Sequence, residues 1–164
     1  MSSSTVKSLT AAVLTISDSC ARGEREDLSG PAVKAGLAKN GFLIHSSSVI
    51  PDEQKKIEQA IVRLASEVQL IVTTGGTGIA ERDVTPEATR AVCSKMLDGV
   101  AERMRAEGIK KTPLAALSRG VCGVCGRSLV LNLPGSPRGA VQSLEAVMDV
   151  IPHALELLAG KTGH

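Results

Sequence analysis

The chain has 164 residues, of which 43% are hydrophobic and 22% charged, and its formal net charge at pH 7 is +2. This length and composition suit one folded domain and exclude general disorder, because enough apolar surface can be buried to offset the entropy lost on folding. A near-neutral chain with one aromatic residue lacks the basic field and stacking surfaces of a nucleic-acid-binding protein. No apolar run in the sequence suits a membrane helix or a signal peptide, so we expect a cytoplasmic protein.

Patterns of strands and helices alternate along the first part of the chain. After a polar segment over residues 1–9, which we expect to be flexible, the apolar and β-branched run 10–16 predicts a buried strand. A polar loop over 19–29 leads to a predicted helix over 31–40, which has proline at its first position. The run 42–49 predicts a second strand.

The middle of the chain continues this alternation. Asp52 is suited to cap the next helix, whose apolar residues recur at helical spacing as far as Val68. A short strand over 70–73 then runs into glycine-rich residues 75–78. Residues 85–87 (Thr-Pro-Glu) have the form of a helix start, with a capping hydroxyl, proline at the first position and an acid in the first turn.

The last part of the chain contains one further strand between two helical stretches. We expect the helix that starts at residue 85 to continue to about residue 107, with a break near 98–99. Residues 128–133 predict a strand. The apolar residues between 141 and 158 predict a helix that Pro152 kinks.

Strands that alternate with helices imply a mostly parallel sheet covered on both faces, and such sheets bind ligands beyond the carboxyl ends of their strands. The polar or glycine-rich segments that follow predicted strands are 17–18, 51–52, 75–83 and 134–139. The last of these precedes a helix N-terminus and contains Arg138, both of which favour anions. We therefore expect these segments to gather at one edge of the sheet and form the ligand site.

The glycine loop, residues 75–78, can present backbone N–H groups to a phosphate, and Thr74 and Thr77 add hydroxyl donors. The loop lacks the lysine of a Walker A motif and the spacing of a dinucleotide-binding fingerprint, and a glycine-rich turn is commonly only a tight connection. Arg82 and Asp83 follow shortly after it. A carboxylate repels a nearby phosphate unless a cation lies between them, which suggests Mg²⁺.

Three aspartates, Asp18, Asp52 and Asp83, each follow a predicted strand. Each also has a purely structural interpretation, since Asp52 can cap its helix and Asp83 can pair with Arg82. Their shared position at the carboxyl edge favours a site, and Asp27 in the polar loop is a further candidate for it.

Two of the four cysteines, Cys122 and Cys125, have C-x-x-C spacing. The sequence has no second such pair to complete a four-ligand zinc site. We therefore expect reduced thiols and interpret the two as small buried residues that flank a glycine-rich turn.

Several motifs, in this order, resemble the MogA/MoaB family of molybdopterin-binding proteins, which includes the G domain of gephyrin. They lie at 14–19, 51–53, 73–78, 82–89, 117–119 and 132–137. The resemblance extends from about residue 10 to 159, and we expect one domain over 10–160. It implies an α/β fold, a three-layer α/β/α sandwich with a mostly parallel central sheet, usually assembled as a homotrimer.

The resemblance also implies a late step of molybdenum cofactor biosynthesis. Members of the MogA type transfer AMP from ATP to the terminal phosphate of molybdopterin and release pyrophosphate. Adenylyl-molybdopterin then passes to a MoeA-type enzyme, which inserts molybdate. The implied activity is that of a molybdopterin adenylyltransferase, with ATP as co-substrate and Mg²⁺ as cofactor.

By motif match, the resemblance implies that Asp52 and Asp83 are the catalytic acids and the metal ligands. It implies that the nucleotide and molybdopterin are bound by Ser17, Asp18, Thr74, Gly75, Gly76, Thr77, Gly78, Ser118, Pro134, Gly135, Ser136 and Arg138. Two residues depart from the family pattern. Glu81 adds an acid that we expect to face solvent, and Cys125 stands where many members carry arginine.

Other functions remain open at this point. A MoaB-type member could bind molybdopterin with little or no adenylyl transfer, and ATP-dependent turnover would distinguish the two. The related CinA and MoeA proteins, and a trimeric scaffold such as gephyrin, have longer chains, which counts against them.

Overall fold

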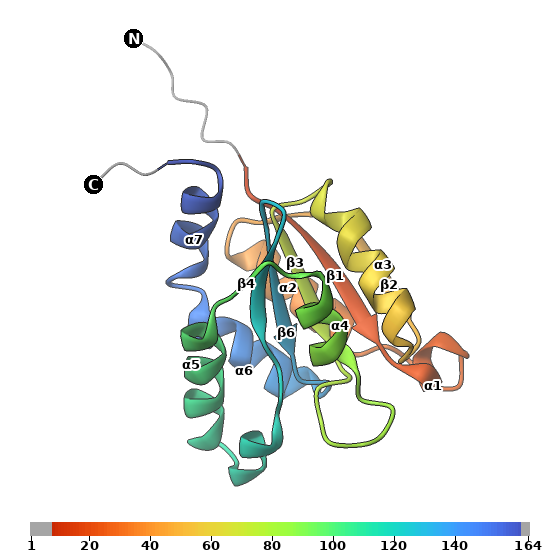
Figure 1. Ribbon diagram of the computed structural model, residues 1–164. Coiled ribbons are helices and arrows are strands. Elements are labelled where there is room, and N and C mark those ends of the chain that lie inside the picture. The colour runs from red at the N-terminus through yellow and green to blue at the C-terminus, as the bar shows by residue number, and fades with distance from the viewer. Residues whose placement is uncertain (1–7, 162–164) are drawn as a thin grey trace.

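The computed structural model describes residues 8–161. Its strands are β1 (Thr10–Ile16), β2 (Leu43–Ile50), β3 (Leu70–Thr74), β4 (Lys95–Met96), β5 (Cys122–Cys125) and β6 (Ser128–Leu133). They form one sheet in the order β2-β1-β3-β6-β5-β4 (Figure 1). The first four strands in this order run parallel to one another, β5 is antiparallel to β6, and β4 is antiparallel to β5. The predicted mostly parallel sheet is confirmed.

Helices cover both faces of this sheet (Figure 1). They are α1 (Asp18–Ala21), α2 (Ser29–Lys39), α3 (Gln54–Ala65), α4 (Thr85–Val92), α5 (Asp98–Ile109), the 3-10 helix η1 (Pro113–Leu117), α6 (Pro137–Val147) and α7 (Ile151–Leu158). Side chains of α2, α5, α6 and α7 pack in one core, and those of α3 and α4 pack in a second core. The three-layer α/β/α sandwich is thereby confirmed. Over residues 8–161, no helix combines the length and apolar character that crossing a membrane requires.

The two cores are separated by the alternation of side chains along each strand. On β1, Ala11 and Val13 face the first core, whereas Ala12, Leu14 and Ile16 face the second. All are at most 2% exposed. A strand that is buried on both faces has an uninterrupted apolar sequence, and this is why the bounds of β1 could be predicted.

The helix predicted over 85–107 is wrong in its middle part. The chain leaves the helix after α4 and pairs with β5, where the Ser94 N–H donates to the Val124 carbonyl at 2.8 Å. The Leu97 N–H donates to the Cys122 carbonyl at 2.8 Å and completes the pairing. The result is the short edge strand β4, which the sequence pattern does not reveal because two residues are too few to show a period.

Pro152 starts a helix instead of kinking one. It lies in the first turn of α7, where its missing N–H leaves no helical hydrogen bond unmade. The polar loop predicted over 19–29 also contains a helical turn, α1. The Ser17 hydroxyl caps this turn by accepting the Cys20 N–H at 3.2 Å. Of the segment predicted to be flexible, residues 1–7 lie outside the described residues, and Leu9 packs against the first core.

Cys122 and Cys125 are buried as expected, but they lie within β5, so the turn predicted between them is wrong. Three residues apart on an extended strand, their side chains point to opposite faces and belong to different cores. This separation is incompatible with both thiols binding one metal ion. Burial raises the pKa of Cys122 to about 12 and that of Cys93 to about 11. Neither thiol is therefore ionised at neutral pH.

Asn132 on β6 links three parts of the fold through a buried polar network. Its amide nitrogen donates to the hydroxyls of Thr73 at 3.1 Å and Thr89 at 3.0 Å. Its carbonyl oxygen accepts the Val121 N–H at 3.2 Å. Because the side chain is 1% exposed, no solvent replaces these partners when it is removed.

We expect Asn132→Ala to lower the free energy of unfolding by about 2 kcal/mol, since it leaves buried donors and acceptors without partners. Urea denaturation measures this change. Asn40→Ala is the matched control, because Asn40 is exposed and its amide donates to the Gly36 carbonyl at 2.8 Å. A change within about 0.5 kcal/mol is expected there, and equal losses in the two variants would contradict the role assigned to the network.

Candidate active site

Two adjoining hollows lie where β1, β3 and β6 end. The larger has a volume of about 520 Å³ and the smaller about 400 Å³. Gly76, Asp83, Gly135 and Ser136 line both and form their common wall. Strand order reverses between β1 and β3, and parallel sheets bind ligands at such a switch point. The geometry therefore provides room for two ligands that meet at one wall.

Apart from Asp18 and Arg138, every residue predicted for the site lines at least one of these hollows. In addition to the common wall, the larger hollow is lined by Thr77, Gly78, Ser118 and Pro134. The smaller is lined by Ser17, Asp52, Thr74 and Gly75. Arg138 is exposed on α6 and lines neither hollow. The structure brings these distant segments together, and their roles in binding stay predictions.

The glycine loop is pressed against the end of β1. Gly75 has a φ of +101°, and a Cβ atom there would lie 2.3 Å from the Ile16 carbonyl oxygen. Only glycine fits such a position without moving the backbone. The Gly75 N–H donates to the Leu133 carbonyl at 3.1 Å, so the loop is tied to the end of β6 as well.

Thr85 holds the glycine loop from the side of α4. Its hydroxyl donates to the Gly75 carbonyl at 3.0 Å, and its N–H donates to the Gly76 carbonyl at 3.1 Å. The predicted capping role of Thr85 is therefore wrong, because the residue at the cap is Val84 and the hydroxyl bonds to the loop. The proline and the acid expected in the first turn of this helix are present there.

Asp18 and Asp52 form a reciprocal pair between two strand ends. The Asp18 N–H donates to Asp52 Oδ2 at 2.9 Å, and the Asp52 N–H donates to Asp18 Oδ1 at 3.0 Å. Asp52 therefore does not cap α3, which begins after Glu53. Arg82 donates through Nε and Nη2 to both oxygens of Asp18 at 2.9 Å. The alternative in which Arg82 pairs with Asp83 is not realised.

Asp83 lies in the common wall, at the end of the loop that follows the glycine loop. Its Oδ2 accepts the Ala80 N–H at 3.0 Å. A Cβ on Gly78 would lie 2.8 Å from this same oxygen, so the carboxylate is packed closely against the glycine loop. Glu81, two residues earlier, is exposed and lines neither hollow, as expected from the sequence.

The acids of this site have pKa values shifted in opposite directions. The Arg82 guanidinium lowers the pKa of Asp18 below its ordinary value. The pKa of Asp52 is raised, first by burial and then by the negative charges of Asp18 and Asp83. A cation near Asp52 would relieve this repulsion and stabilise the ionised carboxylate.

We expect Arg82→Gln to raise the pKa of Asp18, because the variant removes the charge that stabilises its ionised form. A carboxyl-carbon NMR titration measures the shift. A lowered folded-state pKa stabilises the fold above the unfolded pKa, and this contribution is lost as the pH falls through the folded pKa. The Arg82 side chain is 61% exposed, so solvent screens the pair and the variant should lose little stability at neutral pH. Arg103→Gln is the control, because Arg103 forms an exposed ion pair with Asp149. An unchanged Asp18 pKa in Arg82→Gln would contradict the assignment of Arg82 as the cause of the shift.

Comparison with known proteins identifies the family. Residues 12–153 match the family model described as a probable molybdopterin binding domain. The chain belongs to this family. The resemblance to MogA and MoaB found in the motifs is thereby confirmed.

Relatives within the molybdopterin-binding family cover nearly the whole chain. A molybdopterin adenylyltransferase of Helicobacter pylori (strain J99) is 44% identical over 153 residues, which are 90% of this chain and 86% of that protein. The molybdopterin adenylyltransferase of Escherichia coli (strain K12) is 37% identical over 165 residues, covering 90% of this chain and 84% of that protein. The solved structure of the molybdopterin biosynthesis enzyme MoaB from Thermus thermophilus is 50% identical, has a TM-score of 0.88, and covers 93% of this chain and 98% of its own.

Acidic side chains dominate the smaller hollow of this molybdopterin-binding fold. It is lined by Glu26, Asp27, Asp52 and Asp83, with Arg25 as its cationic residue. Within residues 8–161, no group of three or more His, Cys, Asp or Glu residues surrounds a metal position. Mg²⁺ does not need such a cage, because it is held by one or two carboxylates together with substrate phosphates. The Asp52 and Asp83 carboxylates fit this mode of binding.

Some lining residues were not predicted from the sequence. Arg25 and Glu26 belong to the polar loop after β1, so the rule that parallel sheets bind ligands beyond the carboxyl ends of their strands could have identified them. Asp27 of the same loop, named from the sequence as a further candidate, lines the smaller hollow with them. Asp27 also has a structural role, since it accepts the Thr15 hydroxyl at 2.8 Å and the Gly30 N–H at 2.9 Å. The larger hollow is lined in addition by residues such as Met104, Arg105, Gln142 and Ser143. These come from α5 and α6, whose mutual packing no local pattern reveals.

Proposed function

We propose that the chain is a molybdopterin adenylyltransferase that transfers AMP from ATP to the terminal phosphate of molybdopterin and releases pyrophosphate. The observation that carries this proposal is the pair of hollows with one common wall, because a transfer between two substrates requires them to meet. Curated relatives with this name, 37% to 44% identical over 90% of the chain, support the same activity.

In the proposed reaction, an oxygen of the pterin phosphate forms a bond to the α-phosphorus of ATP. The bond between the α-phosphorus and the oxygen bridging to the β-phosphorus breaks, and its electron pair leaves with pyrophosphate. The attacking phosphate is already ionised at neutral pH, so no general base is needed. The protein must therefore hold two anionic substrates, ATP and the pterin phosphate, close together in spite of their electrostatic repulsion.

The chain's own groups suit this task. Apart from the Gly75 N–H, which is bonded to the Leu133 carbonyl, backbone N–H groups of the glycine loop and the N-terminus of α6 would stabilise phosphate oxygens placed beside them. Ser136 caps α6 by accepting the Gly139 N–H at 3.1 Å, which orients that helix end in the common wall. Asp52 and Asp83 would hold Mg²⁺, which supplies neutralising charge to the phosphates when bound.

Two further parts of the proposal rest on the family resemblance, namely assembly as a homotrimer and transfer of the product to a MoeA-type enzyme. A third part, location in the cytoplasm, rests on the sequence pattern. Sedimentation velocity of the purified chain measures the first, and a mass of three chains is the expected result.

A test of the proposed function incubates the chain with molybdopterin, ATP and Mg²⁺ and measures both pyrophosphate and adenylyl-molybdopterin. We expect equal amounts of pyrophosphate and adenylyl-molybdopterin, and we expect them only when molybdopterin, ATP and Mg²⁺ are all present. Pyrophosphate without adenylylated pterin would contradict the proposal.

The second candidate is a MoaB-type protein that binds molybdopterin with little or no adenylyl transfer. It is favoured by one observation, the 50% identity to the structure named MoaB. Calorimetric binding of molybdopterin together with an absence of product would support this candidate over the enzyme.

A further inference from the structure

Arg119 connects the segment before β5 to the loop that carries Asp83. Its Nε donates to the Gly78 carbonyl at 2.8 Å, and its Nη2 donates to the Asp83 carbonyl at 2.9 Å. Its backbone N–H donates to the Thr77 carbonyl at 2.8 Å. One residue therefore bonds to both ends of the segment 78–83.

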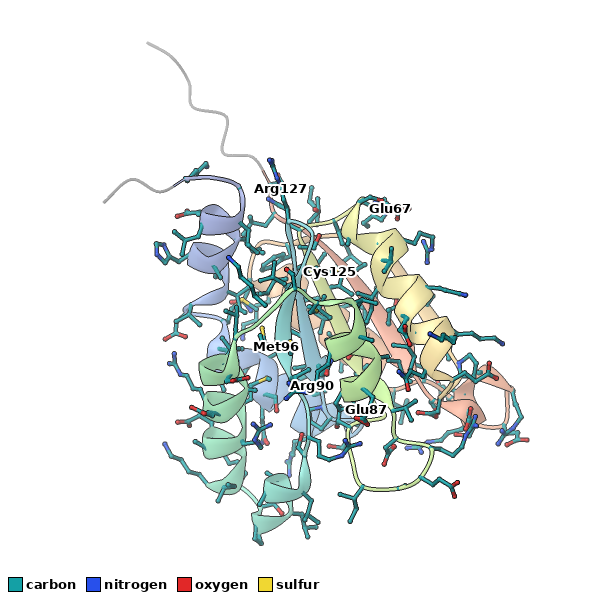
Figure 2. All side chains as sticks on the ribbon, viewed as in Figure 1. Glu67, Glu87, Arg90, Met96, Cys125 and Arg127 are labelled. Carbon is teal, nitrogen blue, oxygen red and sulfur yellow. The ribbon has the colours of Figure 1, made fainter. Side chains whose placement is uncertain are left out.

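The same guanidinium also reaches the following helix. Its Nη1 donates to both carboxylate oxygens of Glu87 at 2.9 Å. Glu87 lies in the first turn of α4, at the end of the helix nearest the glycine loop (Figure 2). The planar fork of arginine spans loop and helix at once, which the single ammonium group of lysine cannot reproduce.

Arg119 lines neither hollow, whereas Thr77, Gly78 and Asp83 do. Most of its N–H donors are used by these carbonyls and by Glu87, which leaves little of the guanidinium for a substrate anion. The Arg119 segment is itself secured, because Arg105 donates through Nη1 to the Gly120 carbonyl at 2.8 Å.

We propose that Arg119 is a positioning residue, which holds segment 78–83 so that the Asp83 carboxylate faces both hollows. This inference rests on the proposed adenylyl transfer, in which Asp83 acts where the two substrates meet. A displacement of about 1 Å at such a position can reduce a rate by roughly 100-fold. Arg119 thus acts on catalysis through the backbone that carries Asp83.

The test compares Arg119→Lys with Arg103→Lys. The control also removes a guanidinium that bonds to a carboxylate, since Arg103 Nη2 donates to Asp149 Oδ2 at 2.7 Å on an exposed surface. For Arg119→Lys we expect kcat to fall by roughly 10- to 100-fold while KM for ATP changes by less than about 3-fold. Amide exchange measured by NMR should accelerate by about tenfold or more at Ala80 and Asp83. The control should leave all of these unchanged.

Faster exchange together with a lower kcat supports the inference. Unchanged amide exchange at Ala80 and Asp83 in Arg119→Lys overturns it. A native kcat in this variant also overturns it, because the positive charge alone would then be enough for catalysis. If the lysine variant fails to fold, Glu87→Gln replaces it, with an expected 2- to 10-fold loss of kcat and local exchange faster than in the native chain. If the native chain forms no product, the proposed function fails, while the exchange rates still decide whether Arg119 holds the loop.

Discussion

Asp52→Asn is expected to reduce kcat by roughly 100-fold or more, because in the proposed reaction the Asp52 carboxylate holds the cation that neutralises the substrate phosphates. The asparagine oxygen can still accept the Asp18 N–H, which Asp52 accepts at 2.9 Å, so the local backbone should not move. Steady-state kinetics with molybdopterin and ATP measures the loss. The same variant should be no less stable than the native chain.

The stability of Asp52→Asn should depend on pH in a defined direction. Burial and the neighbouring acids raise the folded-state pKa of Asp52 above its ordinary value of 3.8. A group of this kind favours the fold below its unfolded pKa, and this contribution is lost as the pH rises through the folded pKa. Asparagine has no charge to lose, so the variant should be more stable than the native chain at neutral pH. The difference should vanish below pH 3.8.

Glu81→Gln is the matched control for Asp52→Asn. It also neutralises an acid close to the site, but Glu81 is exposed and lines neither hollow. Its kcat should stay within about 2-fold of the native value. An equal loss of kcat in the two variants would mean that the total negative charge near the site, and not the Asp52 carboxylate in particular, determines kcat. Native kcat in Asp52→Asn would contradict the assignment of this acid.

Gly75→Ala is expected to lower the free energy of unfolding by about 4 kcal/mol and to abolish ligand binding. Two effects add at this position. The φ of +101° strains any residue with a Cβ, and the new atom would lie 2.3 Å from the backbone oxygen of Ile16. Because that oxygen belongs to β1, the clash can be relieved only by separating the glycine loop from the sheet.

Gly23→Ala separates the two effects. Gly23 has a φ of +74°, but nothing lies within 4 Å of its added Cβ. Only the conformational strain remains in Gly23→Ala, so the free energy of unfolding should fall by about 1 kcal/mol. Thermal or urea unfolding of both variants measures the difference. Equal losses would contradict the close approach between Gly75 and β1.

Strands with strong local patterns were predicted well from the sequence. Residues 10–16 and 128–133 match β1 and β6 at both ends, since each is a buried run of mostly apolar residues. β4 and β5 were not predicted, because β4 exists only through its pairing with β5, and Gly123 gives β5 the composition of a turn.

The gathering of the strand-end segments at one edge could be predicted, but the pairing of the charged groups among them could not. Because the carboxyl ends of parallel strands lie at one edge of a sheet, the segments after them are expected to lie together, but this does not say which charged side chains pair. Arg82 follows the glycine loop in sequence and yet pairs with Asp18, 64 residues away. Likewise, Cys125 replaces an arginine of the family pattern but is buried in the second core and lines neither hollow. Such long-range contacts depend on the packed fold and leave no local pattern.

Adenylyl transfer between the two hollows is tested most directly by following the α-phosphorus of ATP. The native chain would be incubated with molybdopterin, Mg²⁺ and ATP carrying a label either on its α-phosphorus or on its γ-phosphorus. The α label should appear in the pterin product, and the γ label should appear only in pyrophosphate. Transfer of the γ label to molybdopterin, or bound molybdopterin with neither label, would contradict the account.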